Sequence, residues 1–164
     1  LIEGIEVNVE IPDEEYEMLR NILTKKAGYK RADDDGAFYW VDGLGNVCDT
    51  FDVRNSDDNI RYDIANYYST KTVAENNARA DKLMRQLRRF AVEHRNKELN
   101  WLDENQNKYT ISFDCVNQTF DIDYWTRMSE FGTMYFDSEA TAELALKAFK
   151  DELLWYFTEY EDCL

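Results

Sequence analysis

The sequence predicts an α+β fold in which an N-terminal β-α element precedes two tandem β-β-β-α modules, with antiparallel sheets packed against helices. Two internal matches carry this prediction. Residues 67–75, YYSTKTVAE, recur as YFDSEATAE at residues 135–143, a spacing of 68 residues (135 − 67). Residues 50–53, TFDV, recur as TFDI at residues 119–122, a spacing of 69 residues (119 − 50). Two matches in the same order at nearly equal spacing are typical of an internal duplication.

The duplication predicts three segments. The first is the strand-helix element of residues 1–28, and the two modules are residues 29–97 and 98–164. A module of fewer than about 70 residues buries little surface alone. Hydrophobic residues make up 44% of the chain, so we expect the modules to share a core and to form one compact unit.

The N-terminal element is expected from local pattern. Residues 5–9 alternate apolar and polar side chains, which predicts a strand with one exposed face. A helix is expected after Pro12, because acidic residues at 13–15 match the positive end of the helix dipole. Gly28 is the expected end of this helix.

The first module is expected to contain three strands and a helix. Residues 38–41 and 47–53 flank a glycine-containing turn and predict a hairpin. Residues 60–64 alternate apolar and other side chains, which predicts a third strand. A helix is expected from Thr72, because residues 72–75 fit a capping box and apolar residues then recur every three or four positions.

The second module is expected to repeat this order. Residues 108–115 and 119–125 predict the hairpin, and residues 131–137 predict the third strand. A helix is expected from about Ser138.

Charge is unevenly distributed along the chain. The net charge is −15 and the pI is about 4.4. Counting Lys, Arg, Asp and Glu gives −9 for residues 1–70, +5 for residues 71–97 and −11 for residues 98–164. An acidic chain is a poor binder of phosphate backbones, because that affinity comes from Lys and Arg. We therefore expect no direct nucleic-acid binding and instead attraction to basic protein surfaces.

The carboxylates expected to contact such a partner come from both modules: Asp52, Asp57, Asp58 and Asp63 in the first, and Asp121, Asp123 and Glu130 in the second. Alternation along residues 119–125 places Asp121 and Asp123 on one face of a strand, and we expect this face to be exposed. Carboxylates held on a rigid sheet can stand in for phosphates.

A basic stripe is expected on the first module's helix, opposite its apolar stripe: Lys82, Arg85, Arg88 and Arg89. One interpretation is a patch that binds an anionic partner. The other is a solvated helix face neutralised by surrounding acids. The second is favoured, because a charged stripe on an amphipathic helix is usually plain surface.

The sequence contains no recognisable catalytic or metal-binding pattern. His94 is the only histidine, and no catalytic partner is recognisable by spacing. Residues 33–36, DDDG, resemble the start of a calcium loop, but the twelfth position is Leu44, which cannot be a ligand. No glycine-rich phosphate loop follows any predicted strand. We therefore expect a protein that is not an enzyme and that uses no cofactor and no metal.

The cysteines and the apolar runs predict a cytoplasmic setting. Cys48, Cys115 and Cys163 show no CxxC spacing and are expected to be reduced thiols. Apolar runs are far shorter than the ~20 residues that cross a bilayer. The opening LIEGIEVNVE alternates like a strand rather than resembling a leader. No membrane association is expected, and the sequence leaves the oligomeric state open.

Three stretches carry a resemblance to a known group: DNIRYDIANYYSTKTVAE (58–75), RRFAVEH (88–94) and NKYTISFD (107–114). In this order they resemble small acidic proteins encoded by bacteriophages and prophages, in which an aromatic-x-Thr-x-x-x-Ala segment opens a helix. The resemblance covers residues from about 29 to 160. It implies a phage-host setting, where small acidic proteins commonly block defence nucleases, and it carries over no catalytic residues.

Together these observations predict a phage or prophage inhibitor that occupies the basic channel of a host nucleic-acid-binding enzyme, for example a CRISPR effector nuclease, in the bacterial cytoplasm. The alternative is an oligomeric phage structural or regulatory module, or a protein that sequesters a small anion with the helix around residues 85–89. An enzyme of unrecognised type is the third hypothesis.

Overall fold

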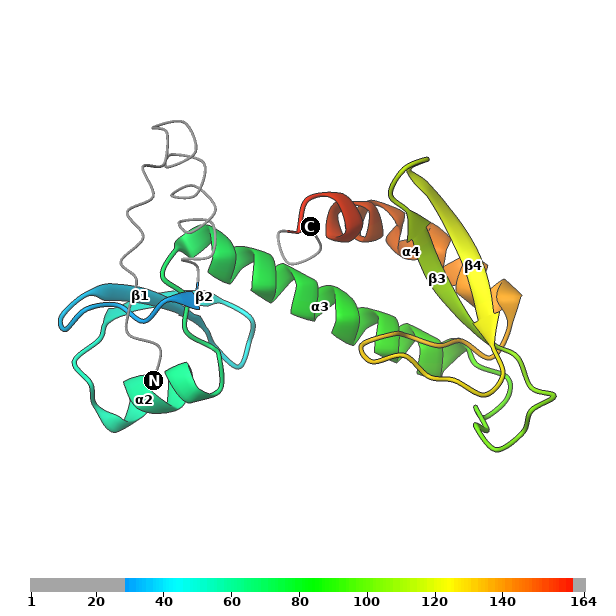
Figure 1. Cartoon of the computed structure of the whole chain (residues 1–164), viewed down its shortest axis with the longest axis horizontal. Coiled ribbons are helices and arrows are strands. Elements are labelled where there is room, and N and C mark those ends of the chain that lie inside the picture. The colour runs from blue at the N-terminus through cyan, green and yellow to red at the C-terminus, as the bar shows by residue number, and fades with distance from the viewer. Residues whose placement is uncertain (1–28, 161–164) are drawn as a thin grey trace, which may run out of the picture. The chain divides into compact units, whose positions relative to one another are not determined.

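The computed structural model describes residues 29–160, in which the first hairpin is followed by two helices and the second hairpin by one (Figure 1). The elements are β1 (Ala37–Val41), β2 (Val47–Phe51), α2 (Ser56–Asp63), α3 (Lys71–His94), β3 (Lys108–Asp114), β4 (Thr119–Trp125) and α4 (Glu139–Thr158). This part of the chain is therefore mixed α and β, with two small antiparallel two-stranded sheets and three helices. The strand-helix element predicted for residues 1–28 lies outside the described residues.

The chain divides into two compact units, Leu1–Glu75 and Asn76–Leu164. The division falls inside α3, just after its first turn. The predicted division into residues 1–28, 29–97 and 98–164 is based on the sequence repeat, not on which residues contact one another. It stays a prediction.

In the first unit a single bridge takes the place of the predicted third strand. β1 pairs with β2, as the hairpin prediction required. On the other edge of β1, Tyr39 and Tyr68 exchange two backbone hydrogen bonds of 2.8 Å. The side-chain amide of Asn66 bonds the N–H and C=O of Val41 at 2.8 Å each. The backbone of Tyr68 and the side chain of Asn66 therefore bond this edge of β1.

The predicted strand at residues 60–64 is wrong, because these residues lie in α2 and its C-cap. Asn55 caps this helix by accepting a hydrogen bond from the backbone N–H of Asp58 at 2.9 Å. Acidic residues in the first turn and Arg61 in the last turn also stabilise the helix by their interaction with its dipole. Ile60 and Ile64 are exposed, so their alternation did not bury a face. In so short a segment the cap outweighs strand propensity.

The second unit repeats the bridged hairpin. β3 pairs with β4 over seven residue pairs. Tyr109 of β3 then exchanges backbone hydrogen bonds of 2.9 and 2.7 Å with Phe136. Residues 131–137 therefore contribute one bridge and not the third strand that the sequence predicted. The tandem β-β-β-α arrangement is not confirmed, because each sheet has only two strands.

The strand-to-helix junctions of the two units match closely at the spacing of 68 residues seen in the sequence. The bridging residues Tyr68 and Phe136 are both buried. The Thr70 hydroxyl accepts from the N–H three residues on at 3.3 Å, and the Ser138 hydroxyl does so at 3.2 Å. α3 therefore begins at Lys71, and the capping box predicted at Thr72 is two residues too late.

The TFDV and TFDI match does not mark equivalent positions. Thr50 lies near the end of β2, opposite Phe38, whereas Thr119 begins β4, opposite Asp114. The duplication is thus supported by the junctions and not by this second match.

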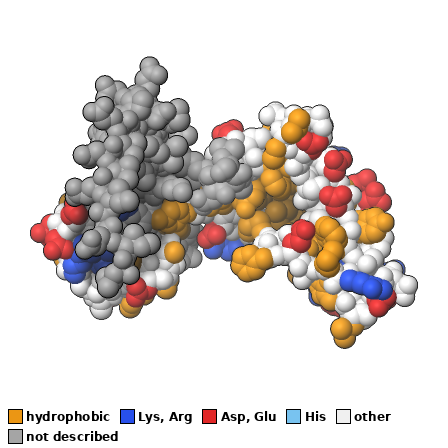
Figure 2. Space-filling model, viewed as in Figure 1, with side chains coloured by type: hydrophobic (Ala, Val, Ile, Leu, Met, Phe, Trp, Pro, Cys, Tyr) orange, Lys and Arg blue, Asp and Glu red, His pale blue; other side chains and the backbone are white. Residues whose placement is uncertain are grey.

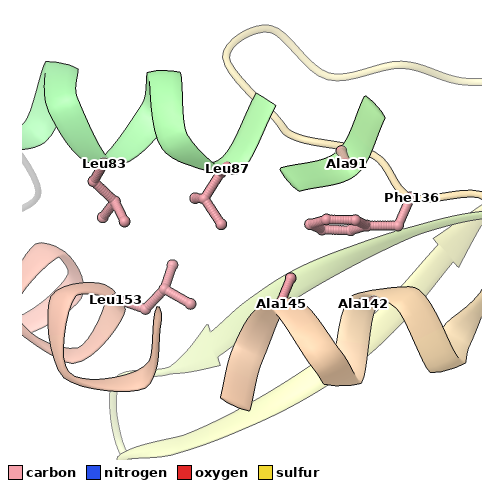
Figure 3. Packing of buried hydrophobic residues seen from close by; sticks show 7 residues of the cluster. All are labelled: Leu83, Leu87, Ala91, Phe136, Ala142, Ala145 and Leu153. Carbon is pink, nitrogen blue, oxygen red and sulfur yellow. The ribbon is translucent and has the colours of Figure 1, made fainter. Parts of the chain in front are cut away.

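The core of the second unit lies between α3, α4 and the bridge residue (Figure 3). Its buried members are Leu83, Leu87, Ala91, Phe136, Ala142, Ala145 and Leu153. In the first unit, Phe38 of β1 stacks on Tyr67, with ring centroids 4.0 Å apart and an interplanar angle of 10°. The apolar periodicity that predicted α3 therefore identified the face that packs.

Candidate functional site

Asp52 belongs to a buried network in the first unit and not to a binding surface. Its side chain is 0% exposed. Arg31 donates to both carboxylate oxygens, at 2.8 and 3.2 Å, and the Tyr67 hydroxyl donates at 3.0 Å. The backbone N–H of Arg54 donates a further bond at 3.0 Å. The prediction that Asp52 contacts a partner is therefore wrong.

The environment of Asp52 favours its charged form. The hydrogen bonds from Arg31 are the largest cause that holds the pKa of this carboxyl far below its usual range, although burial acts in the opposite direction. Burial in turn raises the pKa of the Tyr67 hydroxyl. The carboxylate thus joins the segment before β1, the end of β2 and the bridge segment.

Asp58 is also structural. It is 2% exposed, and its Oδ2 accepts from the backbone N–H of Val53 at 3.0 Å. Its Oδ1 lies 3.5 Å from a guanidinium nitrogen of Arg61. The prediction that Asp58 contacts a partner is therefore wrong as well. Asp57 and Asp63, the other two predicted carboxylates of this module, are exposed on α2.

The predicted carboxylates of the second unit are exposed. Asp121 and Asp123 lie on one face of β4, directly across from Ser112 and Thr110 of β3. The alternate residues of β4 include Phe120 and Ile122, which pack against the core. This packing holds the strand in place, so the two carboxylates project about 7 Å apart from a fixed backbone.

A hollow of about 440 Å³ adjoins this face. Its lining is mainly apolar and comes from α3, both strands, α4 and the loop before the bridge, and it includes Asp123 and Glu130. Phe131, also in the lining, is fully exposed. Figure 2 shows hydrophobic side chains gathered in a hollow on the second unit, with Asp and Glu side chains beside them. The structure therefore brings Asp123 and Glu130 to one concave site.

The basic stripe of α3 is exposed as predicted at Lys82, Arg85, Arg88 and Arg89. Arg89 lies 3.9 Å from Glu93 one turn on, a long contact between two exposed groups. Arg79 was not among the predicted basic residues. Its guanidinium donates to both carboxylate oxygens of Glu152 in α4, at 2.8 and 3.2 Å. Its Cζ lies 3.8 Å from the ring centroid of Trp155. Arg79 therefore ties the two helices together.

Two buried charged residues of the second unit, Lys108 and Asp137, were not predicted from the sequence. Lys108 is 0% exposed, and its Nζ donates to the carbonyls of Asp103 and Thr126 at 2.9 Å each. Asp137 accepts from the backbone N–H groups of Asn96 and Lys97 at 2.6 and 3.0 Å. Burial alone would raise the pKa of Asp137, but these bonds, together with one donated by the Thr141 hydroxyl at 3.0 Å, outweigh it and lower the pKa. The backbone partners of Asp137 lie 40 and 41 residues away in the sequence, which no spacing rule covers.

Groups that could do chemistry are sparse in residues 29–160. The ring of exposed His94 stacks on Phe90 at 3.8 Å, and its Nδ1 lies 3.0 Å from the Phe90 carbonyl. Within the same range no three His, Cys, Asp or Glu side chains cluster as metal ligands would. Cys48 and Cys115 are free thiols, and Cys163 lies outside the described residues. That the protein is not an enzyme and needs no cofactor stays a prediction.

Comparisons with protein-family models, with curated proteins and with solved structures gave no match to this chain. The resemblance to phage-encoded acidic proteins therefore stays a prediction. Across residues 29–160, no helix is both long enough and apolar enough to cross a membrane.

Proposed function

We propose that this chain is a non-enzymatic phage or prophage protein that inhibits a host nucleic-acid-binding defence enzyme, such as a CRISPR effector nuclease. Its carboxylates would occupy a channel lined by Lys and Arg in the bacterial cytoplasm. The observation that carries this proposal is the exposed pair Asp121 and Asp123 on a strand fixed by the core, next to Glu130 at the hollow.

The chemistry follows from charge and rigidity. Residues 98–164 carry a net charge of −11, so a basic surface is attracted over distances longer than a hydrogen bond. Carboxylates fixed on a packed strand lose little conformational freedom when they pair with Lys or Arg. Charge complementarity of this kind mainly speeds association and selects the partner. Asp57 and Asp63 of the first unit are exposed and can add to the attraction.

A matched pair of variants tests the proposal. The site variant combines Asp121→Asn, Asp123→Asn and Glu130→Gln. The control combines Glu139→Gln, Glu143→Gln and Asp151→Asn, which removes three exposed acids from α4 in the same unit. Both variants change the net charge equally, so a difference between them reports position rather than total charge.

The measurement is binding to a panel of purified defence nucleases at low and at physiological salt. We expect the unaltered chain to bind at least one nuclease, with affinity that falls as salt rises. We expect the site variant to bind about tenfold or more weakly, because each lost charge pair at an interface is costly. The control variant should bind like the unaltered chain. Absence of binding even at low salt, or equal loss in both variants, would overturn the proposal.

A further inference from the structure

The outer edge of β4 is an open hydrogen-bonding edge. In an antiparallel pair, residues alternate between those that exchange bonds with their partner and those whose N–H and C=O point away from it. Tyr109 uses its backbone groups for Phe136 and not for Tyr124, which lies opposite it on β4. The backbone groups of Tyr124 therefore point to the opposite edge of the hairpin. With a period of two residues, those of Ile122 and Phe120 do the same.

The first unit confirms this alternation. The backbone groups of Tyr39 bond Tyr68, so those of its cross-strand neighbour Asp49 must point away from β1. The backbone groups of Asp52, three residues further on, should then point toward the partner strand. The N–H of Asp52 does donate to the carbonyl of Gly36 at 2.9 Å.

Nothing in residues 29–160 pairs with the outer edge of β4. β4 is hydrogen-bonded only to β3, and Figure 1 draws these two strands side by side. No backbone hydrogen bond outside the hairpin involves Phe120, Ile122 or Tyr124 within the described range. The edge is seven residues long and contains no proline. An edge of this length is a template for another strand unless charge restricts what can pair.

The charges on β4 select the occupant. If two copies paired antiparallel about Ile122, Asp121 of one copy would face Asp123 of the other, and like charges directly across a sheet are unfavourable. A strand with Lys or Arg at those positions would instead form opposite-charge pairs. Next to Phe120 and Ile122, on the other face, the added strand needs apolar side chains.

We propose that the outer edge of β4 binds an extended segment of a partner protein by antiparallel strand addition, and that this segment alternates basic and apolar residues. The backbone groups of Phe120, Ile122 and Tyr124 supply the hydrogen bonds, and Asp121 and Asp123 supply the selectivity. This inference rests on the proposed function, since it names the kind of segment that a basic partner would present at this site.

The geometry fixes which amides of the added strand matter. A residue opposite Ile122 exchanges backbone bonds with it and carries its side chain on the same face as Ile122. The apolar residues of the added strand therefore direct their N–H groups at β4, and the basic residues direct theirs at solvent.

The probe is the peptide Lys-Val-Lys-Val-Lys-Val-Lys with blocked ends, used with the full unaltered chain. Two matched peptides carry N-methyl groups on every Val or on every Lys. We expect the parent and Lys-methylated peptides to bind alike, and the Val-methylated peptide to bind about tenfold or more weakly because it lacks the bonds to β4. Equal binding of all three peptides, or no binding of the parent peptide at low salt, would overturn strand addition.

Amide hydrogen exchange gives a second readout. In the free chain the amides of Phe120, Ile122 and Tyr124 should exchange faster than those of Asp121 and Asp123, which face β3. The parent peptide should slow the first three and leave the other two unchanged. Protection of the edge that rises with protein concentration in the absence of peptide would instead indicate a second copy as occupant and would overturn the proposal.

These outcomes separate the two proposals. If the three peptides bind equally but the site variant loses nuclease binding, strand addition fails and the proposed function stands. If the unaltered chain binds no nuclease but discriminates between the methylated peptides, the proposed function fails and the edge remains a binding site.

Discussion

The tripeptide Thr-Phe-Asp occurs in both units, with opposite fates for its carboxylate. In the first unit Asp52 is fully buried, bonded by Arg31 and Tyr67. In the second unit Asp121 is exposed on β4. The difference comes from chain position, because the first copy ends β2 beside a segment that supplies a guanidinium, and the second begins β4. The number of acidic residues in a unit therefore does not show how many carboxylates a partner can contact.

The connection between hairpin and bridge differs in the same way. In the first unit α2 lies between β2 and Tyr68, and Asp58 ties its first turn to Val53. In the second unit the corresponding residues, 126–135, contain no helix or strand, and several of them line the hollow. In the first unit Asp58 is thus used for internal structure in this connection, while in the second unit the connection leaves Glu130 at the hollow that Asp123 also lines.

The largest expected effect is on stability, from Asp52→Ala. The variant leaves the Tyr67 hydroxyl and the half-buried Arg31 without their common acceptor, and breaking a buried pair in this way costs about 3 kcal/mol. The matched control is Asp121→Ala, which should change stability by less than about 0.5 kcal/mol because its side chain is exposed. Chemical denaturation of both variants measures the difference. Equal stability of the two variants would contradict the contrast drawn between the two aspartates.

The pH dependence of stability should follow Asp52. Its pKa is lowered on folding, so the unfolded chain takes up a proton at higher pH than the folded chain does. The stabilisation is therefore fully present above the ordinary carboxyl pKa near 4 and is lost as pH falls further toward the folded value. Unfolding free energy measured from about pH 6 down to pH 3 should drop less steeply in Asp52→Ala than in the unaltered chain. Parallel curves would show that Asp52 is not responsible.

The smallest expected effect tests the likeness between the units. Thr70→Ala and Ser138→Ala each remove a hydroxyl that caps a helix, and each should cost about 1 kcal/mol. Ser129→Ala, in an exposed loop position, serves as the control and should be close to neutral. Denaturation midpoints measure all three. A loss at only one of the two caps would mean that the junctions are alike in geometry but not in energy.

Much of the secondary structure was predictable because its causes are local. Both hairpins, the N-cap of α4 at Ser138 and the buried stripe of α3 follow from turns, caps and periodicity. The strand predicted at residues 60–64 failed because two local signals competed, and the cap at Asn55 prevailed over alternation. The prediction of a third strand in each module failed because an isolated bridge needs only one residue in register. A single residue leaves no periodic pattern in the sequence.

The candidate site was predictable only in part, for the same reason. Alternation alone identified the exposure of Asp121 and Asp123, because the alternate residues Phe120 and Ile122 must be covered. Glu130 was selected by composition, and the hollow that it shares with Asp123 came from the packing of helices, strands and loop.

The amino-acid order was sufficient for whatever depends on neighbours a few residues apart: the alternation of β4, the caps of the helices and the exposed basic stripe of α3. Tertiary packing settled the burial of Asp52 by Arg31, 21 residues away, and the open edge of β4, which depends on Tyr109 bonding Phe136. The physical reason is that a carboxylate or a backbone amide is satisfied by whichever group reaches it in space, and the distance along the chain does not limit that choice.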